Sequence, residues 1–180
     1  MSDDQAMTPF AQSMIIAAMI AGAAILQGRV AFAISYRSAE PDFLVIVLAC
    51  GAMLVGGNRG MVLGLLAGYL TASLAANPFT PFGTILASRT IAGSFAAGLQ
   101  RRILRDSVWV PPLVVLSTTL VCDLVYAAMA PHAWLHNLRP WLRIEGGELV
   151  FNVVLSYPCY LILRRMGVGI PREDPFGTGS

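Results

Sequence analysis

The sequence predicts an all-α fold, a polytopic membrane helix bundle with six transmembrane helices, and five spans are the alternative. Hydrophobic residues make up 56% of the 180 residues, and charged residues make up only 12%. Soluble domains contain about 25% charged residues, so this chain has too little polar surface to cover a globule in water. The apolar residues also fall into six separate segments. In a bilayer the backbone polar groups of each such segment must be satisfied internally, which a helix achieves.

The sequence predicts a single transmembrane domain over residues 10–165. A cytoplasmic N-terminal tail is expected over residues 1–9, and a cytoplasmic polar tail over residues 166–180. The first ten residues, MSDDQAMTPF, are acidic, and no small-residue cleavage site follows them in a suitable place. We therefore expect an uncleaved first helix rather than a signal peptide.

Six apolar segments predict the helices, in the order 10–26, 43–55, 61–76, 84–99, 110–130 and 149–163. The second segment begins after Pro41 and Asp42, and a proline and an acidic residue are both favoured where a helix starts. The sequence NPFTPFG, residues 77–83, predicts a turn because it contains two prolines and begins with Asn-Pro. Four segments have only about 15 residues, whereas about 20 are needed to span a bilayer, so five spans remain an alternative.

The third segment carries a small residue at every fourth position: Gly60, Gly64, Gly68, Ala72 and Ala76. In water each glycine costs a helix about 1 kcal/mol relative to alanine. In a membrane, however, a row of small residues lets a second helix approach closely. The stripe therefore predicts a packing face, whose occupant is either another helix of the same chain or the membrane helix of a partner protein.

The distribution of arginine predicts the orientation in the membrane, and all twelve basic residues are arginines. With six spans, seven arginines fall on one side: Arg59, Arg101, Arg102, Arg105, Arg164, Arg165 and Arg172. Four fall on the other side: Arg29, Arg37, Arg139 and Arg143. Cytoplasmic loops carry the excess of positive charge, so the basic loop with Arg101, Arg102 and Arg105 is predicted to be cytoplasmic, together with both termini.

Two charged residues lie inside apolar segments. Arg89 occurs in ILASRTIAG, and Asp123 occurs in LVCDLVY. Charges at membrane depth usually face the interior of a bundle and pair with one another. We therefore predict an intramembrane charge pair between Arg89 and Asp123 with a structural role. Separate partners for the two residues, and a transport or proton-relay role, are the alternatives.

The sequence predicts no catalytic, cofactor-binding or metal site, so we do not expect an enzyme. It contains no hydrolase elbow and no P-loop, and its serines have no nearby base. His132 and His136 have a possible metal spacing but lack a third ligand. They lie in segment 131–148, whose tryptophans and leucines predict an interfacial segment on the outer side. The cysteines lie in apolar runs without a CxxC motif and are interpreted as small core residues: Cys50, Cys122 and Cys159.

Several landmarks follow one another along the chain. In order, they are Leu26-Gln27, PDFLVIVL (41–48), the three glycines spaced by four, PFG (81–83), GLQRRILRDS (98–107) followed by VPP, and N-x5-P-x5-RR from Asn152 through Pro158 to Arg165. In this order and spacing, over residues 26–165, the chain resembles the bacterial rod shape-determining protein MreD family. Members of that family often carry an acidic residue where this chain has Ala72.

The resemblance implies a multi-pass scaffold of the bacterial cytoplasmic (inner) membrane, within the cell-wall elongation complex. Such a scaffold helps to maintain rod cell shape and lateral peptidoglycan synthesis. It would contact membrane lipid and bind the single-pass protein MreC directly. The MreB filament, RodA and its penicillin-binding transpeptidase would be indirect or weak partners, and nucleic acid would not be a partner.

The resemblance also implies an alternative function. The six-helix fold of the family is similar to the substrate-binding subunits of energy-coupling-factor vitamin transporters. The chain would then be such a subunit, and it would need a polar pocket near the outer face. His132, His136 and residues 145–148 are the candidates for that pocket.

Overall fold

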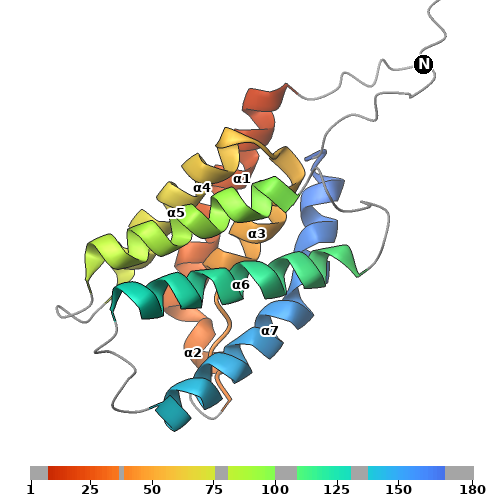
Figure 1. The fold of residues 1–180 in the computed structure, drawn as a ribbon. Helices are drawn as coiled ribbons and strands as arrows, with labels where there is room; N and C mark the ends of the chain where they lie inside the picture. The colour runs from red at the N-terminus through yellow and green to blue at the C-terminus, as the bar shows by residue number, and fades with distance from the viewer. Residues whose placement is uncertain (1–7, 37–38, 76–80, 100–108, 131–137, 169–180) are drawn as a thin grey trace, which may run out of the picture.

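A computed structural model of the chain describes residues 8–36, 39–75, 81–99, 109–130 and 138–168. Within these ranges the fold is all-α, with six helices of 13 to 28 residues and one helix of 4 residues (Figure 1). In chain order they are α1 (Pro9–Arg29), α2 (Ala31–Ile34), α3 (Phe43–Val55), α4 (Asn58–Leu74), α5 (Phe82–Leu99), α6 (Val110–Met129) and α7 (Leu138–Arg165).

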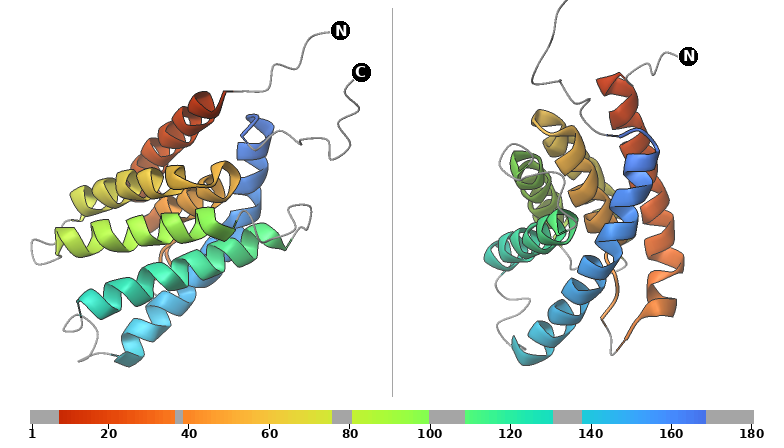
Figure 2. Two further views of the ribbon diagram at one scale, coloured as in Figure 1. Left: turned by 45° about the horizontal axis from the view of Figure 1, so that its top comes forward. Right: turned by 90° about the vertical axis from the view of Figure 1, so that its right-hand side faces the viewer.

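Helix α3 forms the centre of the bundle. It packs against α1, α4, α5, α6 and α7, and Figure 2 shows it between the α4–α5–α6 side and the α1–α7 side. Eleven of its 13 residues are buried. A helix that is apolar all round is typical of the core of a bundle or of a membrane span. The predicted segment 43–55 is confirmed, with the same bounds.

Within the described part of the chain, three helices are long and apolar enough to cross a membrane: Phe10–Arg29, Val110–Met129 and Leu142–Arg165. Each also presents large apolar side chains outward; Ile25, Leu124 and Val154 are 69%, 70% and 66% exposed. Such surfaces suit a lipid environment, where the outside of a bundle is as apolar as its core. Helix α3 is apolar but shorter, so the count of six spans stays a prediction.

Helices α4 and α5 lie side by side in Figures 1 and 2, and glycines bring their backbones into contact. A Cβ atom added to Gly60 would lie 2.5 Å from the Gly93 carbonyl oxygen, and one added to Gly64 would lie 2.5 Å from the Arg89 carbonyl oxygen. On Gly68 it would lie 3.0 Å from the Leu86 Cα atom. These distances leave no room for a side chain, so the occupant of the glycine stripe is α5 of the same chain.

Helix α7 differs from its predicted counterpart at the N-terminal end. The sequence predicts an interfacial segment over 131–148 and a helix from residue 149, whereas α7 begins at Leu138 and runs through Gly146, Gly147 and Pro158 to Arg165. Glycines and acidic residues resemble a loop by composition. Gly147 lies in the helix because it packs against Ala39, whose Cβ atom a side chain on Gly147 would overlap. Residues 131–137 lie outside the described part of the chain.

Candidate functional site

Asp42 lies at the N-terminus of α3 and links this helix to the rest of the bundle. Its Oδ1 atom accepts a hydrogen bond from the Val45 backbone N–H (3.0 Å) and so caps the helix. Its Oδ2 atom forms an ion pair with the Arg89 guanidinium group on α5. Both charged side chains are only 13% exposed. One carboxylate therefore satisfies an α3 backbone group and neutralises the buried charge of α5.

This ion pair corrects the predicted pair between Arg89 and Asp123. Asp123, on α6, lies within electrostatic range of Arg89 but makes no ion pair with it. The physical reason is the central position of α3, which brings its N-terminal carboxylate into contact with α5. Arg89 therefore has a partner other than Asp123, and Asp123 has no ion-pair partner among the described residues.

Two amide side chains from other helices fix the residues on either side of the cap. Gln27, near the end of α1, donates from Nε2 to the Pro41 carbonyl oxygen (3.1 Å) and accepts at Oε1 from the Phe43 backbone N–H (2.9 Å). Asn152, on α7, accepts at Oδ1 from the Asp42 backbone N–H (2.9 Å). The start of α3 is thus held by α1, α5 and α7 together.

Asn152 also extends the network toward α6. Its Nδ2 atom donates to the Thr119 Oγ1 atom and to the Glu148 Oε1 atom, both at 3.4 Å. The Asn152 side chain is fully buried, and a buried amide that lacks partners is costly. In this network Asn152 has an acceptor or donor partner on α3, on α6 and on its own helix.

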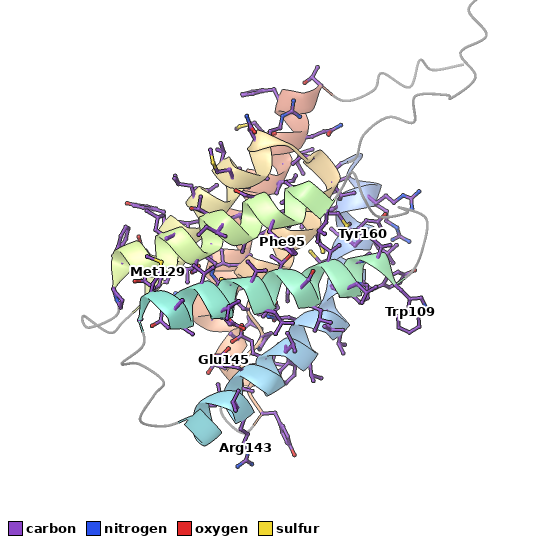
Figure 3. The ribbon with its side chains drawn as sticks, in the orientation of Figure 1. Phe95, Trp109, Met129, Arg143, Glu145 and Tyr160 are labelled. Carbon is purple, nitrogen blue, oxygen red and sulfur yellow. The ribbon has the colours of Figure 1, made fainter. Side chains whose placement is uncertain are left out.

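A groove of about 490 Å³ opens between α6 and α7 beside this network. Its described walls are leucine, alanine and glycine, except for two carboxylates: Asp123 on α6 and Glu145 on α7. Figure 3 shows Glu145 at the space between these two helices. A smaller hollow, of about 200 Å³, is lined in part by Gln27, Asp42 and Thr71.

The polar residues of this network and of the two hollows gather at one end of the bundle. They come from the C-terminal parts of α1, α4 and α6 and from the N-terminal parts of α3, α5 and α7. Under the predicted orientation this is the outer end. The described part of this site contains one cation, Arg89, and four carboxylates: Asp42, Asp123, Glu145 and Glu148.

The other predicted site residues are placed as follows. Ala72 is half-buried, and Ala76 lies outside the described residues. The basic loop with Arg101, Arg102 and Arg105 also lies outside them, as do His132 and His136. Among the described residues no group of three or more histidine, cysteine or acidic side chains is arranged to hold a metal ion.

The three cysteines occupy core positions as free thiols, with Cys50 and Cys122 buried and Cys159 half-buried. The roles of Gln27, Asp42 and Asn152 in the network are not among those predicted from the sequence. Each is a polar residue at the edge of, or inside, an apolar segment, and that signal was available. Their common meeting point was not, because it depends on which helices are neighbours.

Comparison of the chain with protein-family models, with curated proteins and with solved structures finds no match.

Proposed function

We propose that this chain is a multi-pass scaffold of the bacterial inner membrane that acts in the cell-wall elongation complex. It would bind the single-pass protein MreC and, through it, connect the MreB filament with RodA and its penicillin-binding transpeptidase. Maintenance of rod shape and lateral peptidoglycan synthesis would depend on it. The proposal rests on the likeness of the landmark order to the MreD family.

The observation that carries the proposal is the meeting of three landmarks that are far apart in the sequence. Gln27, Asp42 and Asn152 belong to the first, second and last landmarks, and hydrogen bonds join all three positions at the start of α3. A chance likeness would scatter its matching residues over the fold. Residues that hold the helices together are the ones that a shared fold requires, and this supports a likeness of fold behind the likeness of spacing.

The packing of the glycine stripe supports a scaffold in a second way. The third landmark, Gly60, Gly64 and Gly68, lies against α5, so it determines the shape of the platform and is not available to a partner. The partner surface must therefore be sought elsewhere on the bundle, among the exposed apolar faces of α1, α6 and α7.

The experiment is a depletion of this protein in its native bacterium, combined with recovery of MreC on the tagged chain. Depletion should convert rods into round cells, and the tagged wild-type chain should restore rods and co-purify MreC from solubilised membranes. An unrelated multi-pass protein with the same tag is the control. Rod-shaped cells after depletion, together with no recovery of MreC above the control, would contradict the proposal.

A second candidate function is the substrate-binding subunit of a vitamin-type energy-coupling-factor transporter. The observation that favours it is the groove with Asp123 and Glu145 at the predicted outer end of the bundle, where such a subunit would take its substrate. Thermal-shift screening of the purified chain against vitamins tests this function. A shift of several degrees with one vitamin and none with its close analogues supports it, and no shift with any vitamin contradicts it.

A further inference from the structure

The walls of the groove between α6 and α7 repeat one pattern on both helices. Among the described residues, those that line the groove on α6 are Leu120, Asp123, Leu124 and Ala127, and those on α7 are Leu142, Glu145, Gly146 and Leu149. Each set follows the spacing i, i+3, i+4, i+7, which places four residues on one face of a helix. Seven residues of helix rise about 10.5 Å, or two turns. The groove is therefore a trough between two helix faces, of the length and shape that a third helix fills.

The apolar part of the trough is not covered by the described part of the chain. Leu120, Leu124 and Leu142 are 52%, 70% and 54% exposed. Lipid tails would cover these leucines as well as a protein would. The leucines alone therefore do not identify the occupant.

The two carboxylates identify it. Asp123 and Glu145 make no ion pair or side-chain hydrogen bond with any described residue. Arg89 is already paired with Asp42, so the described part of the site keeps an excess of acidic groups. Arg143 is exposed, and it lies two positions from Glu145, which places it on a different side of α7. A lipid tail cannot form an ion pair or a hydrogen bond with these carboxylates, and a charge at membrane depth that lacks such a partner is costly.

We propose that the trough binds a transmembrane helix of a partner protein that carries a basic side chain, arginine or lysine, at the depth of Asp123 and Glu145. The apolar side chains of that helix pack on the exposed leucines, and its cation lies between the two carboxylates. This inference rests on the proposed function, since it specifies where a single-pass partner docks and what chemistry its helix must have.

The test uses two synthetic single-span peptides in vesicles that contain the full-length chain. One is a leucine–alanine helix with a single arginine six residues from its end, which matches the interval from Asp123 to Met129 at the end of α6. The other has leucine at that position. Energy transfer from labelled protein to labelled peptide measures binding. We expect the arginine peptide to bind about tenfold more tightly, as one close charge pair can provide.

The double variant Asp123→Asn/Glu145→Gln should reduce this preference to about twofold or less. Glu40→Gln is the matched control, because it also removes an acid but lies outside the trough, and it should keep the preference. Melting of each variant in detergent verifies that it is folded. Equal binding of the two peptides to the wild-type chain, or a preference that survives in the double variant, would overturn the inference. So would tight binding of dodecylamine with no preference between the peptides, which would assign the trough to a small amine.

Recovery of MreC separates this inference from the proposed function. If MreC co-purifies equally with the wild-type chain and the double variant, the trough is not its docking site, and the inference fails while the proposed function stands. If MreC is not recovered even with the wild-type chain, the proposed function fails. The peptide measurement still decides whether the trough binds a cationic helix.

Discussion

The contact between α4 and α5 leads to a sharp prediction for Gly64→Ala. The added Cβ atom would lie 2.5 Å from the Arg89 carbonyl oxygen and 2.9 Å from the Thr90 Cα atom. Ordinary contacts between such atoms are about 3.5 Å or more, so the two helices must separate by about 1 Å. Both neighbours are backbone atoms, which cannot rotate away as a side chain does.

Overpacking of this kind typically costs about 1–3 kcal/mol, which is about a 5- to 150-fold change in the unfolding equilibrium constant. Alanine also has a better helix propensity than glycine by about 1 kcal/mol in water, which would hide part of the cost. Gly22→Ala on α1 is therefore the matched control, since its added Cβ atom would meet nothing within 4 Å. The difference between the two variants isolates the steric cost.

The assay is unfolding of the purified variants in detergent micelles, followed by circular dichroism during titration with a denaturing detergent. Gly64→Ala should be less stable than Gly22→Ala by about 1–3 kcal/mol. Because the obstructed atom belongs to Arg89, the variant should also weaken the ion pair with Asp42. If the two variants were equally stable, the close approach of α4 and α5 would not contribute to stability, and the glycine stripe would not act as a packing face.

Three further predictions concern the network and the topology. Asp42→Asn should leave the Arg89 charge unpaired and destabilise the fold by about 3–5 kcal/mol. The yield of folded protein in membranes should then be much lower than for Asp123→Asn, and equal yields would contradict the assignment of the pair. Asn152→Leu should cost about 1–3 kcal/mol because the buried Asp42 N–H loses its acceptor, and a variant that melts like the wild-type chain would show that this hydrogen bond is dispensable. Alkaline phosphatase fused after Ser180 should be inactive because the C-terminus is predicted to be cytoplasmic, and high activity would reverse the topology.

Apolar periodicity was sufficient to predict most of the helices. The predicted segments 43–55, 84–99 and 110–130 lie within two residues of α3, α5 and α6. The start of α7 was wrong by eleven residues, from 149 to Leu138. The spacing of tryptophans and leucines over 131–148 predicted an interfacial segment, and the packing of Gly147 against Ala39, which allows the helix to continue through it, depends on contact with another segment.

The candidate site was less predictable than the helices. The rule that charges in a membrane pair with one another correctly identified Arg89 as a residue that needs a partner. The partner it predicted, Asp123, was wrong, because Arg89 pairs with Asp42. From the sequence, Asp42 is predicted only to start a helix. The cap uses one oxygen atom of its carboxylate and the ion pair uses the other, so the cap gives no indication of the ion pair. Spacing along a helix predicts which residues share a face, whereas the choice between Asp42 and Asp123 depends on which helix occupies the centre.

The hydrogen bonds around Asp42 also have a consequence for how the protein is made. They join residues that are 47 and 110 positions apart in the chain. During synthesis α3 is made before α5 exists, and the Asp42 N–H gains its acceptor only when α7 has been made. A chain that stops before Asn152 therefore presents an incomplete polar cluster, of the kind that membrane proteases and chaperones can recognise. The polar cluster at the start of α3 is therefore complete only once α7 has been made.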